Sequence, residues 1–278
     1  MKLAYESLEN RLVQSVVPPD SFYLTQTIKD QEFPAYADLI ASFVEQTDAY
    51  AQRILTAIRD TDRKAYMPQA LPRKLKEYAF LDYSFKQTGY PVMTRPSTLF
   101  GMIRLLSLQE KGANILHIGG GSGYTDEILS RITGEDGHIY SVEINETSAH
   151  RTENNLQRRS ISNVTVICAD GANGLPEHGP YDGILYTAAL AFISDAVKAQ
   201  LLDGGRIVAP VGNAIIQRYF IPGNVHQVTR NGDNFYESVD TVPVRFMPVE
   251  SEKNGAYTRL ALDILVPSAR IPFRRNHQ

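Results

Sequence analysis

The sequence has a single cysteine, no long apolar run and little net charge, and each of these absences excludes a class of protein. One cysteine, Cys168, excludes an intrachain disulfide and a metal cluster built from cysteines. No apolar run approaches the length of a transmembrane helix. Neither a signal pattern at Met1–Glu6 nor a lipidation motif at the other end is present. These features predict a soluble protein in the reducing cytoplasm.

The charge balance gives no global reason to expect a nucleic-acid partner. Lys and Arg number 28 and Asp and Glu number 31, so the formal net charge is -3. The hydrophobic share of 43% against 21% charged residues predicts a packed core rather than disorder. The length of 278 residues allows one large domain, or one domain with extensions. No metal, membrane or nucleic acid is expected, and the oligomeric state is left open.

Between residues 113 and 212, strand-like and helix-like segments alternate. The strand-like runs are 115–118, 138–142, 164–168, 181–186 and 206–211. The helix-like segments between them are 125–132, 148–159 and 193–202. This alternation predicts an α/β fold, a doubly wound, mainly parallel Rossmann-like sheet with helices on both faces. Further strands at 215–221 and 242–249 are expected near the edge of the sheet.

The residues before this region have a different pattern. Apolar side chains recur at helical spacing from 37 to about 63, and a second helix is predicted over 99–106. Between them, residues 78–96 contain glycine and prolines that are typical of a loop or short hairpin. We see no internal repeat and no low-complexity segment.

A glycine-rich turn joins the strand 115–118 to the helix that follows it. Its glycines, Gly119, Gly121 and Gly123, let the backbone approach a ligand that a side chain would block. The dinucleotide-binding fingerprint separates its last two glycines by two residues, and a phosphate-binding P-loop continues with Gly-Lys-Ser/Thr. This turn has neither pattern, so it predicts a different nucleotide-like cofactor.

Acidic residues follow the turn and end the next two strands. Asp126 and Glu127 would compete with a pyrophosphate at the helix start and suit a sulfonium cation better, or they are ordinary surface charges. Glu143 ends the second strand, where a carboxylate can accept both ribose hydroxyls. Asp170 ends the third strand, where it either accepts from an adenine amine or forms a turn with Gly171.

Ordered segments spread over most of the chain resemble protein-L-isoaspartate O-methyltransferases, a family of class I S-adenosylmethionine-dependent methyltransferases. Ile118–Tyr124 resembles I-G-T-G-S-G-Y, and Gly204–Gly212 resembles G-G-R-x-V-x-P-V-G. Pro180–Ile184 with Thr187–Ala189 resembles P-Y-D-x-I followed by T-A-A. The shorter matches are Arg63–Pro68 (R-x-x-F-V-P), Ala79–Asp82 (A-Y-x-D), Met93–Pro96 (I-S-Q-P) and Val244–Val249 (V-R-F-V-P-L).

The resemblance implies a cofactor, an acceptor and a domain organisation. The cofactor is S-adenosyl-L-methionine, and the residues expected to bind it are His117, Gly119, Gly121, Ser122, Gly123, Glu143, Asp170 and Gly171. The acceptor is a peptide or a small molecule. The implied organisation is an N-terminal extension, a helical and substrate-loop region, a methyltransferase core and a C-terminal extension, at 1–36, 37–112, 113–249 and 250–278.

Two residues before the turn are the candidates for acceptor binding. Thr94 has a hydroxyl where the family has serine, and it either positions an acceptor carboxylate or caps the helix after Pro96. Asp82 either orders the substrate loop or caps a turn. The segment Thr88–Thr94 differs from the family's G-x-G-Q-T-I-S, which predicts a reshaped acceptor pocket.

His117 stands where the family has an acid. It is expected to be a hydrogen-bonded residue of a buried strand, or to contact the methionine part of the donor. Cys168 is expected in the core.

Three functions are compatible with this pattern. The first is carboxyl methylation of isoaspartyl peptides, because a carboxylate with a pKa near 4 is ionised at neutral pH and needs no general base. The second is O- or N-methylation of a modified peptide or specialised metabolite. The third is a non-catalytic relative that binds the cofactor or a partner protein.

Overall fold

The computed structural model describes residues 48–69, 76, 79, 84, 93–108, 112–212, 214–216, 219–221, 223–244 and 246. The expected extensions 1–36 and 250–278 lie outside these ranges, and so does Asp82. The elements below are those of the described part of the chain.

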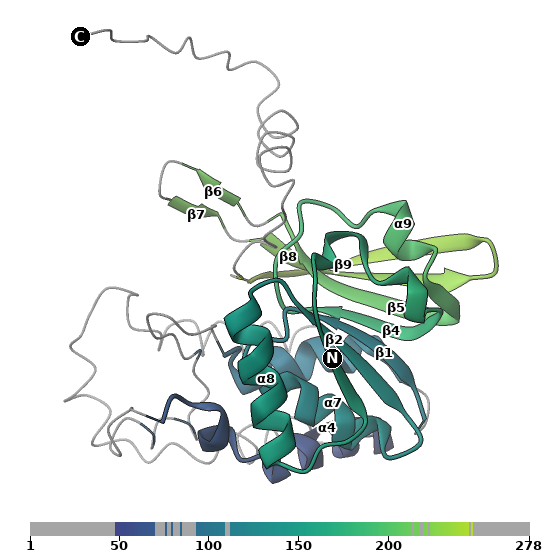
Figure 1. The fold of residues 1–278 in the computed structure, drawn as a ribbon. Helices are drawn as coiled ribbons and strands as arrows, with labels where there is room; N and C mark the ends of the chain where they lie inside the picture. The colour runs from purple at the N-terminus through teal and green to yellow at the C-terminus, as the bar shows by residue number, and fades with distance from the viewer. Residues whose placement is uncertain are drawn as a thin grey trace, which may run out of the picture. The chain divides into compact units, whose positions relative to one another are not determined.

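A seven-stranded sheet forms the centre of the fold, in the order β3-β2-β1-β4-β5-β8-β9 (Figure 1). The five strands that pair in parallel are β1 (Asn114–Ile118), β2 (His138–Glu143), β3 (Val164–Cys168), β4 (Tyr181–Tyr186) and β5 (Leu201–Val211). The antiparallel strands β8 (Gly223–Asn231) and β9 (Asn234–Val244) extend the sheet beyond β5. The predicted α/β fold with a mainly parallel sheet is confirmed.

In the described part of the chain, two α-helices precede the sheet and three lie between its parallel strands. The α-helices are α4 (Ala49–Asp60), α6 (Pro96–Leu106), α7 (Tyr124–Thr133), α8 (Glu146–Arg158) and α9 (Asp195–Lys198). The 3-10 turns are η1 (Arg63–Tyr66), η3 (Gly171–Asn173) and η4 (Pro176–His178). Asp48 and Asn145 cap α4 and α8 by accepting from the backbone amides of Ala51 and Ser148.

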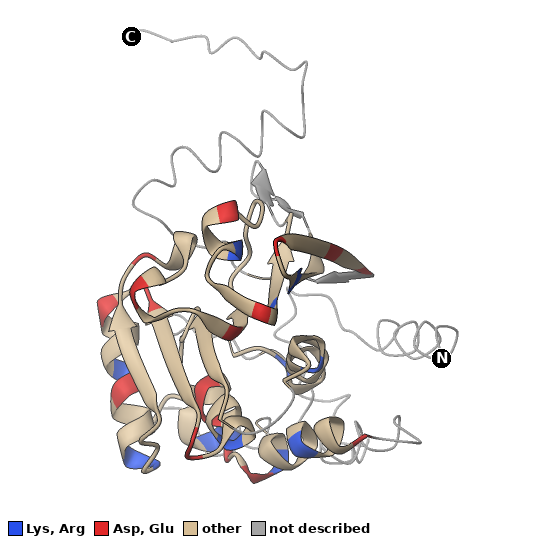
Figure 2. Cartoon of the chain, turned by 90° about the vertical axis from the view of Figure 1, so that its right-hand side faces the viewer, with Lys and Arg blue, Asp and Glu red and all other residues tan. Residues whose placement is uncertain are grey.

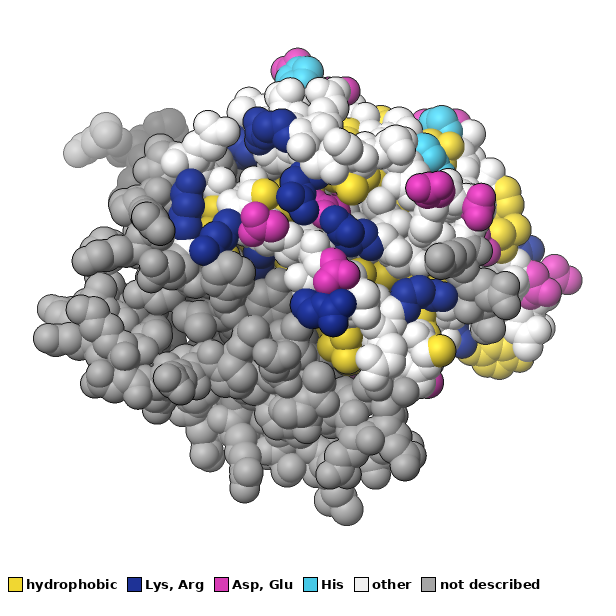
Figure 3. Space-filling view, turned by 90° about the horizontal axis from the view of Figure 1, so that it is seen from below, with side chains coloured by type: hydrophobic (Ala, Val, Ile, Leu, Met, Phe, Trp, Pro, Cys, Tyr) yellow, Lys and Arg dark blue, Asp and Glu magenta, His cyan; other side chains and the backbone are white. Residues whose placement is uncertain are grey.

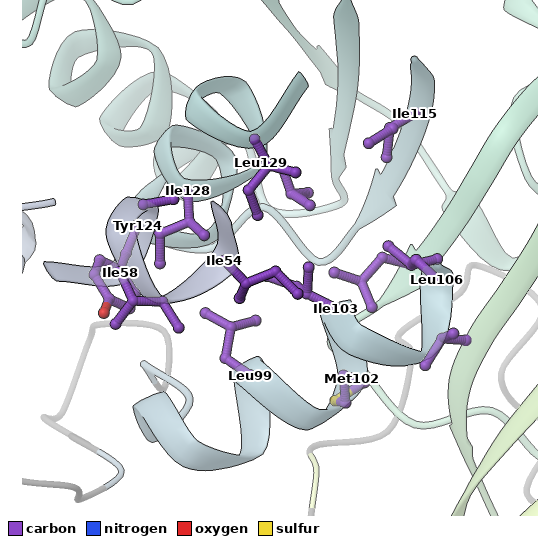
Figure 4. Close-up of a cluster of buried hydrophobic side chains, with 14 of the residues drawn as sticks. Ile54, Ile58, Leu99, Met102, Ile103, Leu106, Ile115, Tyr124, Ile128 and Leu129 are labelled. Atoms are coloured by element: carbon purple, nitrogen blue, oxygen red, sulfur yellow. The ribbon is translucent and has the colours of Figure 1, made fainter. Parts of the chain in front are cut away.

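The sheet has an apolar layer on each face. In Figure 4, side chains of α4, α6 and α7 point toward one another beneath β1, including Ile54, Leu99, Ile103 and Leu129. Each is fully buried, and such burial stabilises the fold by about 1.5–3 kcal/mol per side chain. A second cluster on the other face joins residues of β4 and β5 to Val197 of α9 and neighbouring segments. These layers fix the strand ends on which the candidate site is built.

The structure corrects three predicted elements. The helix predicted over 193–202 is only the four residues of α9, because Leu201 already pairs with Tyr181 as the first residue of β5. The strand predicted at 215–221 is two short strands, β6 (Ala214–Ile216) and β7 (Tyr219–Ile221). The hairpin of β8 and β9 was missed apart from the last residues of β9, which overlap the strand predicted at 242–249, although its two-residue Gly-Asp turn at residues 232–233 is a recognised hairpin signal.

Charged side chains of both signs are distributed over the described surface. Figure 2 shows both basic and acidic residues on the helices and loops of the described part of the chain. On the face seen in Figure 3, acidic side chains lie among the basic ones. Within the described ranges, no helix is both long enough and apolar enough to cross a membrane.

Candidate functional site

Four parallel strands end side by side where the strand order of the sheet reverses. β1 lies between β2 and β4, and β3 lies beyond β2. The chain therefore leaves these strands at neighbouring points, which hold Gly119, Glu143, Asp170 and Thr187. Open α/β sheets bind their ligands outside the carboxyl ends of the strands at such a switch point. We take this edge of the sheet as the candidate site.

The glycine turn adopts a backbone conformation that side chains disfavour. Gly119, Gly121 and Gly123 have φ angles of 100°, 61° and 88°. A Cβ added to Gly119 would lie 3.0 Å from Thr187 Oγ1, and one added to Gly123 would lie 3.3 Å from Tyr66 Cε1. The turn therefore packs tightly against its neighbours, and its spacing in the sequence has a direct structural reason.

Replacing Gly119 by alanine is expected to weaken donor binding more than tenfold, because the new Cβ combines a disfavoured φ with a close contact to Thr187. Gly204→Ala is the matched control, since Gly204 has a φ of +79° and nothing within 4 Å of an added Cβ. The control should lose about 1–2 kcal/mol of stability and retain donor affinity. Calorimetric titration with the donor and thermal unfolding separate the two effects. Equal donor affinity in both variants would contradict the expectation.

Two polar side chains of helix α8 donate hydrogen bonds to the backbone of the turn. Thr152 Oγ1 donates to the Gly121 carbonyl at 3.0 Å, and Asn155 Nδ2 donates to the Ser122 carbonyl at 2.7 Å. Both side chains are buried. The sequence analysis did not identify them. Polar residues on the face of α8 that also carries the buried Leu156 are the signal that could have found them.

The two acids at the strand ends lie where the sequence predicts, and both accept hydrogen bonds from backbone amides. Glu143 is half-buried and accepts from the backbone amides of Gly121 at 2.9 Å and Asn145 at 3.0 Å. Asp170 is exposed and accepts from the backbone amide of Ala172 at 2.9 Å, which caps η3. Gly171 packs closely, since a Cβ there would lie 2.7 Å from Ile118 Cγ2.

His117 and Asp126 form a fully buried pair behind the turn. The distance from His117 Nδ1 to Asp126 Oδ1 is 2.6 Å, and both side chains have no exposed surface. The other ring nitrogen, Nε2, lies 2.9 Å from Thr187 Oγ1. His117 is therefore a hydrogen-bonded residue of a buried strand, as one of the two interpretations of the sequence predicted. The interpretation of Asp126 as a surface charge is wrong.

Glu127 is also buried, so the same interpretation fails for this residue. Its carboxylate accepts from Arg131 Nη2 at 2.6 Å, from Arg159 Nε at 2.9 Å and from the Tyr66 hydroxyl. Burial raises the pKa of Glu127, but the hydrogen bonds from Arg159, Tyr66 and Arg131 outweigh it and hold that pKa below its usual value. Burial and the Glu127 carboxylate together raise the pKa of Tyr66. This cluster joins α7 to η1 and to the end of α8.

Thr94 lies directly before α6, but it does not cap that helix. The N-cap residue is Arg95, whose Nε donates to Thr98 Oγ1 at 2.7 Å. The Thr94 carbonyl accepts from Nη2 of the buried Arg63 at 3.1 Å. The Arg63 guanidinium also lies 5.5 Å from the ring centroid of Tyr124, the first residue of α7. Arg63, which the sequence analysis did not single out, thus connects the Thr94 segment to the helix that follows the glycine turn.

Cys168 is not a core residue. It is exposed at the end of β3, because β3 is the edge strand of the sheet. Among the described residues, no group of three or more His, Cys, Asp or Glu side chains is arranged to hold a metal ion.

Comparisons with known proteins agree on one family. The family model "Protein-L-isoaspartate(D-aspartate) O-methyltransferase (PCMT)" matches residues 36–254. A protein-L-isoaspartate O-methyltransferase from Methanospirillum hungatei JF-1 is 37% identical over 197 residues, which are 71% of this chain and 84% of the relative. The match with the family model spans most of the chain.

Two solved structures share the fold. One is a protein-L-isoaspartate O-methyltransferase with a TM-score of 0.66 and 24% identity, matched over 78% of this chain and 65% of the other. The other, from Plasmodium falciparum in complex with S-adenosyl-L-homocysteine, has a TM-score of 0.60 and 14% identity, over 78% of this chain and 99% of the other. With the family match, they lead to one conclusion: the chain belongs to the protein-L-isoaspartate (D-aspartate) O-methyltransferase family of class I S-adenosylmethionine-dependent methyltransferases.

Proposed function

We propose that this protein transfers a methyl group from S-adenosyl-L-methionine to the side-chain carboxylate of isoaspartyl residues in peptides. The observation that carries the proposal is the Glu143 carboxylate, held against the Gly121 amide of the glycine turn at the switch point of the sheet. Membership of a family named for this reaction supports it. Residues 37–249 are proposed as the catalytic part, in line with the family match over 36–254.

The residues at the strand ends fit the proposed donor. The three glycines with positive φ give the turn the tight backbone conformation that holds it against Thr187 and Tyr66 at the end of β1. The proposed role of Glu143 is to accept from ribose hydroxyls, and that of Asp170, after the next strand, is to accept from an adenine amine. The relative from Plasmodium falciparum, in complex with S-adenosyl-L-homocysteine, supports this assignment. The remaining contacts are assigned to Ser122 and Gly171.

The donor supplies a methyl group already activated by its positively charged sulfur, so the protein has to bind and align the reactants. A carboxylate acceptor is ionised at neutral pH and needs no base. His117 is fully buried and engaged at both ring nitrogens, so it is not available as a general base. The proposed role of Thr94 is to hold the acceptor carboxylate, with Arg63 fixing the position of its backbone.

Thr94→Val is expected to lower kcat/KM for the peptide about tenfold, since one hydrogen bond to a charged group is lost. Thr94→Ser keeps the hydroxyl and should stay within about threefold of the unmodified protein. Donor affinity should be equal in all three proteins, as measured by calorimetry. If Thr94→Val instead lowers donor affinity and leaves kcat/KM for the peptide unchanged at saturating donor, Thr94 contributes to the donor site and the proposed acceptor role is wrong.

The function is tested by methyl transfer from labelled donor to two peptides of one sequence, one with an isoaspartyl and one with an aspartyl residue. The proposal expects a base-labile methyl ester on the isoaspartyl peptide and little label on its isomer. Donor binding without label on either peptide would favour a modified peptide or small metabolite as acceptor. If the protein binds no donor, neither methyltransferase function holds, and a non-catalytic protein that binds a partner remains as the alternative.

A further inference from the structure

A chain of buried side chains links helix α7 to the first glycine of the turn. Asp126 on α7 contacts Nδ1 of His117 on β1, and Nε2 of His117 lies 2.9 Å from Thr187 Oγ1. Thr187 Oγ1 in turn donates to the Gly119 carbonyl at 2.9 Å. The Thr187 amide donates to the Ile118 carbonyl at 2.9 Å, which fixes the threonine beside the turn. Three elements that shape the turn, namely α7, β1 and the end of β4, therefore meet in one hydrogen-bonded path.

Counting hydrogens gives this path a direction. The Thr187 hydroxyl has one hydrogen, and the Gly119 carbonyl can only accept it. If that hydrogen goes to Gly119, the hydrogen between Thr187 and His117 must come from Nε2 of the ring. The opposite arrangement, with Thr187 donating to Nε2, would leave the Gly119 carbonyl without this donor.

Asp126 favours the first arrangement, because a histidine with one ring hydrogen beside an ionised Asp126 would bury a net negative charge. A net-neutral pair holds two hydrogens, one between Nδ1 and Oδ1 and one on Nε2. Asp126 Oδ1 lies 2.6 Å from Nδ1 of His117, close enough that a hydrogen must lie between the two atoms. Its Oδ2 is buried without a hydrogen-bond partner, as is Ser141 Oγ on the neighbouring strand. The Asp126 carboxylate therefore depends on His117 for the hydrogen bond that offsets its burial, and it holds the ring in one orientation.

We propose that His117 is a positioning residue for donor binding: held by Asp126, it donates from Nε2 to Thr187 and so directs the Thr187 hydroxyl to the Gly119 carbonyl. Gly119 has a φ of 100° and packs directly on Thr187, so this hydrogen bond fixes the peptide plane that opens the turn. The inference rests on the proposed function, because donor binding is the property that the turn serves.

Thr187→Val removes the hydroxyl with little change in volume, and Thr187→Ser retains it. In the valine variant, the dissociation constant of the donor, measured by calorimetry, should rise about five- to tenfold, as expected for one lost hydrogen bond. Its KM for the donor should rise alike, with kcat and the KM for the peptide unchanged. The serine variant should match the unmodified protein within about threefold. Equal donor affinity in the valine and serine variants would overturn the proposal.

Nitrogen-detected NMR of the protein without donor tests the direction of the path independently of activity. The proposal expects His117 to carry a hydrogen on Nε2 at neutral pH, and that signal to be absent in His117→Gln. A bare Nε2 would mean that Thr187 donates to the ring, which overturns the inference. If the unmodified protein binds no donor at all, the proposed function fails instead, and the NMR result still decides the hydrogen-bond direction.

Discussion

Replacing Glu143 by glutamine is expected to raise the dissociation constant of the donor about 100-fold. The carboxylate is assigned two charge-assisted hydrogen bonds to ribose hydroxyls, each worth about 1.5–3 kcal/mol, and an amide can supply only part of this. Glutamine also disturbs the bonds from the Gly121 and Asn145 amides, which place the side chain against the turn. Calorimetric titration with S-adenosyl-L-methionine or S-adenosyl-L-homocysteine measures the change.

Glu146→Gln is the matched control for this prediction. Glu146 lies three residues further along the chain in the first turn of α8, and its side chain is largely exposed. The control makes the same change of charge near the site without touching the assigned contact. Its donor affinity should stay within about twofold of the unmodified protein, because exposed charges contribute little. Similar losses in both variants would mean that net charge, rather than the ribose contact, controls binding.

Replacing Glu127 by glutamine is expected to lower the free energy of unfolding at pH 7 by about 2–4 kcal/mol. This is less than the roughly 3–5 kcal/mol for breaking a fully buried ion pair, because Arg131 and Arg159 are partly exposed. The Glu127 carboxylate has no exposed surface and accepts from Arg131, Arg159 and Tyr66. Asp60→Asn at the exposed pair with Arg59 is the control, and it should cost less than about 0.5 kcal/mol. Chemical denaturation of the three proteins measures both values. A loss below 1 kcal/mol in Glu127→Gln would show that the cluster is not a major source of stability.

The stabilisation from Glu127 should also depend on pH. Because the pKa of Glu127 is lowered in the folded state, its contribution is complete above the unfolded pKa, near 4.3 for a free glutamate. It is lost as the pH falls through the lower pKa of the folded state. The difference in stability between the unmodified protein and Glu127→Gln should therefore be constant from pH 7 to about 5 and shrink in more acidic solution. A difference that grows on acidification would contradict this sign.

The parallel part of the sheet could be predicted from sequence because its central strands β1 and β4 are buried on both faces. Such strands are short apolar runs between turn signals, as in the run from Asn114 to Ile118. The β8–β9 hairpin lacks that signal, since β9 is exposed along most of its length and mixes polar with apolar residues. The prediction made helix α9 too long, because Leu201 is an apolar residue at helical spacing but belongs to strand β5.

The candidate site could be predicted where local sequence determines it. The glycine spacing and the acid that ends β2 lie in short segments whose backbone geometry follows from nearby residues. The path from Asp126 through His117 to Thr187 could not be predicted, because His117 and Thr187 are 70 positions apart and meet only through the pairing of β1 with β4. The pairing of His117 with Asp126 likewise needs the position of α7 over the sheet.

A structure of the protein with S-adenosyl-L-homocysteine bound tests the central claim most directly, namely that the carboxyl edge of the sheet is the donor site. We expect the ribose hydroxyls within hydrogen-bonding distance of Glu143, the adenine amine near Asp170, and the backbone of Gly119–Gly123 in contact with the ligand. The Thr187 hydroxyl should still contact the Gly119 carbonyl. A ligand bound at another place, or at this edge without a contact to Glu143, would contradict the account.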